Sequence, residues 1–235
     1  MVRSSFQSEV LATSQPTQNY LVYVPPCFDR DAGRAYPVVY LLHGAQTDEN
    51  QWADIGVAAA ADRLITNAQI PPLLIVLTDA IWAMGAYEGN PQVVDMVLID
   101  ELMPVIERQY PTIRDRAHRA VGGISRGGEW ALLVVGHHPE EFGTVGGHSP
   151  AVGPPTTPNN YIVPVVANNR AARIWLDDGE GDSLTGSVAS FHQALDQAGI
   201  AHEYHSWPGG HDRAYWGSHL DDYLRFYSAS WPAQS

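Results

Sequence analysis

Short, nearly continuous apolar runs recur along the chain, and stretches with helical periodicity separate them. Continuous rather than alternating apolarity is typical of strands that are covered on both faces of a sheet. We therefore predict strands at five runs: VVYLL (38–42), LLIVL (73–77), RAVGGI (119–124), IWLDD (174–178) and HEYHSW (202–207).

The stretches between these strands place apolar residues on one face of a helix. Three stripes have this spacing: Leu98, Leu102, Val105 and Ile106; Val188, Phe191 and Leu195; and Leu220, Tyr223, Leu224 and Tyr227. Pro104 interrupts the first stripe, so we expect a kink or a new helix start there.

Strands that alternate with amphipathic helices indicate a mostly parallel α/β sheet with helices on both faces. The N-terminal part differs, because SSFQSEVLA and NYLVYVP read as two strands with no helix between them. We expect these two strands to pair antiparallel at the sheet edge. Residues 150–171 are rich in Pro and Asn, which predicts a surface excursion rather than a domain boundary. Residues 1–235 are thus expected to form one domain.

The charged residues of the chain limit the kinds of molecule that it is expected to bind. The chain has 13 Lys and Arg against 26 Asp and Glu, a formal charge of −13, which argues against nucleic acid and anionic membrane as partners. No apolar run approaches the roughly 18 residues of a membrane helix. The start, MVRSSFQSEVLATSQ, lacks the apolar core of a signal peptide. We expect a cytoplasmic protein, or a secreted one given without its leader, and the oligomeric state stays open.

One glycine-rich stretch carries candidate chemistry. GISRG (123–127) fits the G-x-S-x-G pattern of a nucleophile elbow, follows a predicted strand and precedes the apolar helical run EWALLVVGHH. A glycine-rich structural turn is the alternative, but the strand–turn–helix context favours Ser125 as a nucleophile. A serine hydroxyl needs a base within hydrogen-bonding reach.

The base should come from a loop beyond a strand end. Eight histidines follow Ser125, and His211 alone stands in such a loop, in WPGGHD between HEYHSW and a helical stretch. The acid should end the preceding strand, where IWLDDGEGDS offers several carboxylates. The spacing slightly favours Asp182 over Asp178, although Asp182 could instead cap the following helix.

An oxyanion hole requires two N–H donors aimed at the developing charge. The backbone N–H of Arg126, directly after Ser125, should supply one. The loop after VVYLL, which begins His43-Gly44, should supply the other from Ala45 or Gln46, with His43 as a structural hydrogen-bonder.

Taken together, these segments resemble the esterase D / feruloyl esterase-like family of α/β-hydrolases, whose relatives include enterochelin esterases and mycolyltransferases. The resemblance covers nearly the whole chain, through NYLVYVPPCFD, PVVYLLHGAQTDENQW, RAVGGISRGGEWALLVVGHHPEEFGTVGGHSP and WPGGHDRAYWGSHLDDYLRFY. It implies an α/β-hydrolase fold with Ser125 as nucleophile and His211 as base. It also favours Asp182, in the G-x-x-D turn GEGD, as the acid.

Several positions depart from the family pattern. Cys27, the single cysteine, stands where glycine is usual, and Arg126 where methionine is common. His148 precedes the family-like Ser149 where an apolar residue is usual. The Arg126 side chain could face the pocket or join a surface ion pair. The segment after Asp79 is short, which implies a small or absent lid.

We therefore expect a serine carboxylesterase that uses neither a metal ion nor a cofactor. The expected substrates are small-molecule or carbohydrate esters, with hydroxycinnamoyl esters of carbohydrates ahead of acetyl-sugar and short acyl esters. An acyltransferase and a catalytically silent ligand-binding protein are the alternatives. Four tryptophans in or near predicted site loops could stack on sugar or aryl groups, or fill the core: Trp52, Trp82, Trp207 and Trp216.

Overall fold

Eight strands form one sheet in the computed structural model, which describes residues 1–12, 14–26, 28–29, 33–79, 92–153 and 162–231. The strands are β1 (Val2–Gln7), β2 (Thr17–Tyr23), β3 (Val38–Leu42), β4 (Leu74–Thr78), β5 (Arg119–Ile124), β6 (Thr144–His148), β7 (Arg173–Gly179) and β8 (Glu203–Trp207). Their order across the sheet is β1-β2-β4-β3-β5-β6-β7-β8. From β4 to β8 all neighbours pair parallel, and β2 pairs antiparallel with both β1 and β4.

The predicted parallel sheet with an antiparallel N-terminal edge is confirmed. The first strand, however, ends at Gln7 instead of running through residues 4–12. The carboxylate of Glu101 accepts hydrogen bonds from the Ser8 hydroxyl and from the N–H groups of Glu9 and Val10. This contact with a distant helix turns the chain away from the sheet.

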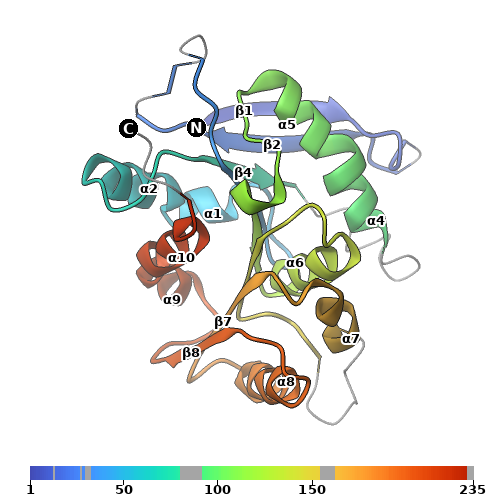
Figure 1. Cartoon of the computed structure of the whole chain (residues 1–235), viewed down its shortest axis with the longest axis vertical. Coiled ribbons are helices and arrows are strands. Elements are labelled where there is room, and N and C mark those ends of the chain that lie inside the picture. The colour runs from blue at the N-terminus through green and yellow to red at the C-terminus, as the bar shows by residue number, and fades with distance from the viewer. Residues whose placement is uncertain (13, 27, 30–32, 80–91, 154–161, 232–235) are drawn as a thin grey trace.

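Helices cover both faces of the sheet (Figure 1). The α-helices are α1 (Gln51–Asp54), α2 (Val57–Thr66), α4 (Gln92–Asp95), α5 (Met103–Gln109), α6 (Arg126–His137), α7 (Ile162–Val166), α8 (Thr185–Gln197), α9 (Arg213–Ser218) and α10 (Leu220–Ser228). Short turns of other helix types are η1 (Met96–Leu102, π), η2 (Arg116–His118, 3-10) and η3 (Ala167–Asn169, 3-10). Two buried apolar clusters result, one under α4 to α8 and one under α1, α2, α9 and α10.

The helix type changes beside Pro104, where the sequence predicts a kink or a new helix start. A π-helical segment, η1, runs directly into α5, and Pro104 lies in the first turn of α5. The prediction of a surface excursion over 150–171 is wrong for residues 162–166. Ile162 and Val166 of α7 are fully buried, so this part packs against the core.

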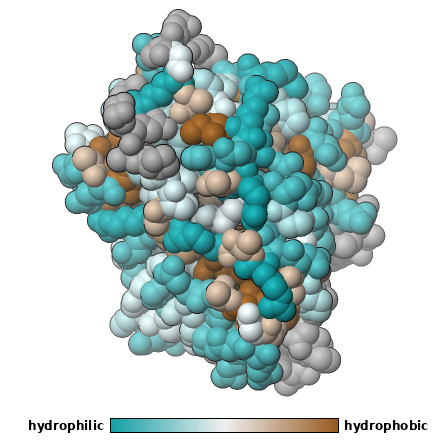
Figure 2. All heavy atoms as spheres, viewed as in Figure 1, coloured by the Kyte–Doolittle hydropathy of each residue, from teal (hydrophilic) through white to brown (hydrophobic). Residues whose placement is uncertain are grey.

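The surface seen in Figure 2 is mainly hydrophilic, and its hydrophobic residues form separate patches. Within the described residues only Met1, Val2 and Met96 are large hydrophobic residues that stand exposed. The same residues include no helix that is long and apolar enough to cross a bilayer. Parallel pairing from β3 to β8 places the carboxyl ends of these strands, and the loops that follow them, along one sheet edge.

Candidate active site

Ser125 stands between β5 and α6 in a strained backbone conformation, with φ +55° and ψ −115°. A Cβ atom on Gly123 would lie 2.3 Å from the Gly127 carbonyl oxygen, and one on Gly127 would lie 2.5 Å from the His43 carbonyl oxygen. Only glycine permits such close approach of strand, turn and neighbouring loop. The Ser125 N–H donates to the His148 carbonyl at 2.8 Å, which holds the turn against β6. This is the geometry of a nucleophile elbow.

The loops after β7 and β8 bring Asp182 and His211 together. Nδ1 of His211 lies 2.7 Å from Oδ2 of Asp182, while the other Asp182 oxygen accepts the Leu184 N–H at 2.7 Å. Burial raises the pKa of Asp182, but hydrogen bonds from His211, the Leu184 N–H and the Ser149 hydroxyl lower it by more. The pKa of Asp182 therefore lies below its ordinary value. Asp182 is therefore held as a carboxylate that orients the imidazole.

Backbone hydrogen bonds join the loop after β7 to the loop after β8. Gly181 N–H donates to the Gly209 carbonyl at 2.8 Å, and Glu180 N–H donates to the Trp207 carbonyl at 2.8 Å. A Cβ on Gly179 would lie 2.6 Å from the Gly209 oxygen, and Gly209 has φ +148°. The glycines of GEGD and PGGHD thus serve a mutual contact that the sequence motifs alone do not reveal.

Ser149, after β6, links the elbow to the Asp182–His211 pair. Its hydroxyl accepts a hydrogen bond from Trp216 Nε1 at 3.2 Å and interacts with the Asp182 carboxylate. Trp216 in turn packs edge-on against the His211 ring, with centroids 5.0 Å apart. From the sequence, Ser149 is recognisable only as family-like, because its partners come from α9 and the loop after β7.

Ser125 and His211 lie along the same edge without a hydrogen bond between them. Within the described chain, neither the Ser125 hydroxyl nor Nε2 of His211 has a hydrogen-bond partner. The His211 side chain is 30% exposed. Such contacts in ligand-free sites are often long and shorten when substrate binds.

The loop after β3 lies directly against Ser125. A Cβ on Gly44 would lie 3.4 Å from Ser125 Cβ, and Gln46 has φ +62°. The N–H groups of Ala45, Gln46 and Arg126 have no acceptor among the residues that the structure describes. Three free donors beside a serine suit an oxyanion hole.

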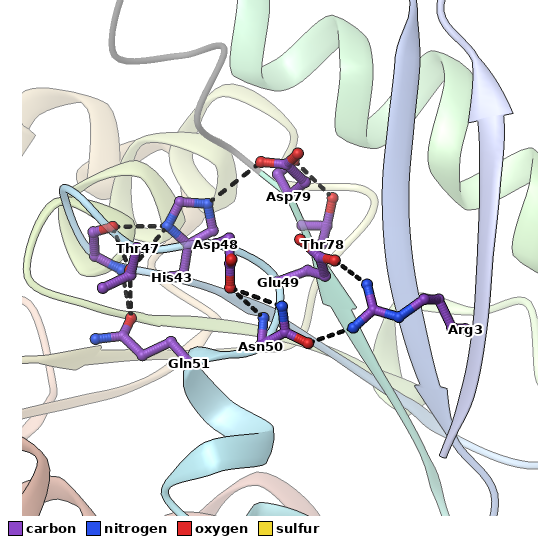
Figure 3. Close-up of polar contacts among 10 residues, drawn as sticks. Arg3, His43, Thr47, Asp48, Glu49, Asn50, Gln51, Thr78 and Asp79 are labelled. Atoms are coloured by element: carbon purple, nitrogen blue, oxygen red, sulfur yellow. Dashed lines mark hydrogen bonds and ion pairs between the residues drawn. The ribbon is translucent and has the colours of Figure 1, made fainter.

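Hydrogen bonds from neighbouring side chains hold the loop after β3 in place (Figure 3). Gln51 Oε1 accepts the Gly44 N–H at 2.7 Å, and the Thr47 hydroxyl donates to the Gly44 carbonyl at 2.8 Å. Nδ1 of His43 lies 2.6 Å from that carbonyl, and Nε2 lies 3.8 Å from Asp79. His43 therefore holds the loop, as expected, and the contribution of Gln51 was missed.

The Arg126 side chain has its charged partner on its own helix. It forms an ion pair with Glu129, one turn along α6, and the Glu129 carboxylate is buried. This answers the question that the sequence left open, in favour of an ion pair.

Asp178, the alternative acid, is fully buried. Neither carboxylate oxygen has a hydrogen-bond partner of good geometry within the described residues. Burial raises the pKa of Asp178, and the nearby Tyr204 and Thr185 hydroxyls offset this only in part. The structure therefore pairs His211 with Asp182.

A second His–Asp pair lies under the site. His148 Nδ1 is 2.6 Å from Asp177 Oδ1, and its Nε2 is 2.8 Å from the Tyr227 hydroxyl. The Tyr215 and Tyr223 hydroxyls donate to Asp177 Oδ2 at 2.9 and 2.8 Å. This fully satisfied network explains how a histidine replaces an apolar residue at position 148.

The four tryptophans separate into different environments. Trp52 is buried in the core, where its Nε1 donates to the Leu42 carbonyl at 2.9 Å, which favours the core-filling alternative for this residue. Trp216 is also buried but touches His211. Trp207 is half-buried and stacks on His219 at 4.2 Å. Trp82, like the segment expected to form a small lid, lies outside the described residues.

Comparison with known proteins fits this architecture. A family model described as "Putative esterase" matches residues 13–227. The chain belongs to this esterase family. A solved structure of a ferulic acid esterase superposes with a TM-score of 0.82 at 27% identity and covers 98% of each chain. The predicted resemblance and the α/β-hydrolase fold are thereby confirmed.

The sequence of this esterase-family protein is similar to two curated relatives over most of its length. It is 28% identical to an endo-1,4-beta-xylanase/feruloyl esterase of Xylanibacter ruminicola, over 86% of this chain and 29% of the relative. It is 31% identical to the iron(III) salmochelin esterase of Escherichia coli, over 86% of this chain and 52% of the relative. The chain thus spans about half or less of the length of these two relatives.

Proposed function

We propose that this chain is a serine carboxylesterase in which Ser125, His211 and Asp182 act together. The observation that carries the proposal is the strained Ser125 elbow at the same sheet edge as the 2.7 Å His211–Asp182 contact. Three N–H groups beside the serine, unpaired among the described residues, support the proposal because acyl transfer needs donors for the oxyanion.

In this mechanism Nε2 of His211 accepts the Ser125 proton while the serine oxygen bonds to the ester carbonyl carbon. The N–H of Arg126, with that of Ala45 or Gln46, stabilises the oxyanion. The intermediate collapses, and the alcohol leaves with the proton from His211. Water then attacks the acyl-enzyme with the same base, and the carboxylic acid and free Ser125 are released. Asp182 stays ionised and stabilises the imidazolium.

For the substrate we propose hydroxycinnamoyl esters of carbohydrates. The names of the xylanase/feruloyl esterase relative and of the ferulic acid esterase structure support this class. A cavity of about 290 Å³ beside the oxyanion loop is lined by Thr47, Asp48, Gln51, Asp54 and Arg213. Its polar lining suits sugar hydroxyl groups. The second relative is named for a different ester, iron(III) salmochelin, and the alternative substrates are acetyl-sugar and short acyl esters.

A substrate panel tests the proposal. We expect hydrolysis of methyl ferulate, with weaker release of acetate from acetylated xylan and of short acids from p-nitrophenyl esters. Ser125→Ala should abolish each reaction, whereas unchanged hydrolysis in that variant would overturn the mechanism. Preference for p-nitrophenyl acetate over methyl ferulate would retain the mechanism and overturn the substrate class. Added glycerol distinguishes a transferase, which would form glyceryl esters in place of free acid.

A further inference from the structure

A cluster of two histidines and an aspartate joins α8 to β8, away from the proposed active site. His192 and Asp196 are four residues apart on α8 and so share one face of the helix. Gly199, with φ +65°, reverses the chain after α8, and His202 then lies directly before β8. The turn between helix and strand thus brings His202 back over the other two side chains.

The polar atoms of these three residues converge. Nδ1 of His192 lies 2.7 Å from Nε2 of His202, and Nε2 of His192 lies 3.6 Å from Asp196 Oδ2. One possible ligand atom from each residue can be chosen so that all three lie within 4.8 Å of one another. This spacing fits three ligands around one ion.

Contacts around the cluster orient its rings for binding. Nδ1 of His202 lies 2.8 Å from the Ile200 carbonyl, which can only accept a hydrogen bond. Nδ1 therefore carries the proton, and the lone pair of His202 is on Nε2, the nitrogen that faces His192. Carbonyl contacts of this kind fix the tautomer of metal-binding histidines. The His192 ring stacks on Tyr204 with centroids 4.5 Å apart, which holds its plane.

We propose that His192, Asp196 and His202 bind one divalent transition-metal ion of the Zn²⁺ class. Two imidazoles and a carboxylate match zinc, with water as the fourth ligand, whereas Ca²⁺ and Mg²⁺ prefer all-oxygen sites. The two nitrogens must separate from 2.7 Å to about 3.3 Å, the spacing across a tetrahedral ion with bonds of about 2.0 Å. As the ion binds through Nδ1 of His192, the proton between the rings passes by way of solvent to Nε2 of His192, so the ring stays neutral.

The position of the site indicates a structural role. The helix α8 follows the loop that carries Asp182, and the strand β8 precedes the loop that carries His211. An ion that joins α8 to β8 therefore stabilises the two elements next to the Asp182–His211 contact. The sequence predicts no metal ion for catalysis, since ester hydrolysis by a serine enzyme needs none. The pattern H-x3-D-x5-H (192–202) was the available signal.

Zinc titration of the full chain without a histidine tag tests the site by calorimetry. We expect one zinc per chain with micromolar affinity. His202→Ala should weaken binding at least tenfold. Asp196→Asn, on a side chain that is 62% exposed and thus safe for folding, should weaken it several-fold. His118→Ala is the matched control, because the His118–Asp115 pair has a similar 2.7 Å contact but belongs to no cluster of three ligands among the described residues.

Thermal unfolding gives an independent readout. A hundredfold excess of zinc over its dissociation constant should raise the Tm of the parent protein and of His118→Ala by roughly 5–10 °C. The same zinc should leave His202→Ala nearly unchanged. Absence of saturable binding would overturn the proposal. So would binding that survives both His202→Ala and Asp196→Asn, or that disappears in His211→Ala instead.

Discussion

The two His–Asp pairs of this molecule have nearly the same contact and different surroundings. His211–Asp182 and His148–Asp177 join Nδ1 to a carboxylate oxygen at 2.7 and 2.6 Å. Both are carried by segments at the carboxyl ends of parallel strands. Contact geometry alone therefore does not separate a proposed catalytic pair from a structural one.

What separates the pairs is the second ring nitrogen. Nε2 of His148 is occupied by the Tyr227 hydroxyl, and the His148 and Asp177 side chains are completely buried. Nε2 of His211 has no partner within the described part of the chain, and the ring is 30% exposed beside the Ser125 elbow. A base must exchange protons with a substrate, and only His211 has the free nitrogen and the access to do so.

The first prediction removes the exposed pair. His211→Ala should lower kcat/KM for an ester substrate by about 10³-fold or more, because Ser125 loses its base. The Tm should change by no more than a few degrees, since the ring is partly exposed. Steady-state kinetics and thermal melts of the same preparation measure both effects. Retained activity would assign the base to another residue.

The second prediction removes the buried pair. His148→Ala takes one hydrogen-bond partner from the buried Asp177 carboxylate and one from the Tyr227 hydroxyl, and it leaves a cavity. Together these changes should cost about 3–5 kcal/mol of unfolding free energy. Urea titration measures this loss. If His148→Ala instead kept full stability and lost activity, the distinction between the two pairs would fail.

The third prediction concerns the link between the regions. Ser149→Ala removes the hydroxyl that contacts Asp182 and Trp216, so kcat should fall about tenfold with KM nearly unchanged. Ser149→Thr, which restores a hydroxyl, should recover part of the loss. A change confined to KM would indicate a substrate contact rather than a positioning role.

The fourth and smallest effect separates the two candidate acids. Burial raises the pKa of Asp178, so its ionised form destabilises the fold at neutral pH. Asp178→Asn should keep activity and gain up to about 1 kcal/mol of stability at pH 8. As the pH falls, Asp178 of the parent protein becomes protonated and no longer destabilises the fold. The stability advantage of Asp178→Asn should therefore vanish below the unfolded-state pKa of the carboxyl, near pH 3.

Urea titrations of Asp178→Asn and the parent protein at both pH values check the sign. Asp182→Asn is the counterpart and should lose activity. The reverse pattern of activity would make Asp178 the acid.

The site residues that the sequence predicts share one property: each is recognisable from the segments next to it in the chain. Ser125, Asp182 and His211 each follow a recognisable strand in the expected order, and the parallel sheet aligns them. Ser149 and Gln51 were missed because their roles depend on contacts between distant elements. The strand end at Gln7 was misplaced for the same reason, since Glu101 lies 94 residues further along the chain. Trp52 shows that a residue near a site loop can still belong to the core.

The most direct test of the account is covalent labelling with a fluorophosphonate, followed by intact-protein mass spectrometry and peptide mapping. The account predicts one adduct per chain, on Ser125, that is absent in Ser125→Ala and forms much more slowly in His211→Ala. His148→Gln, assayed while folded, should still be labelled. No adduct on the parent protein, or an adduct that persists in Ser125→Ala, would contradict the central claim that Ser125 is the nucleophile.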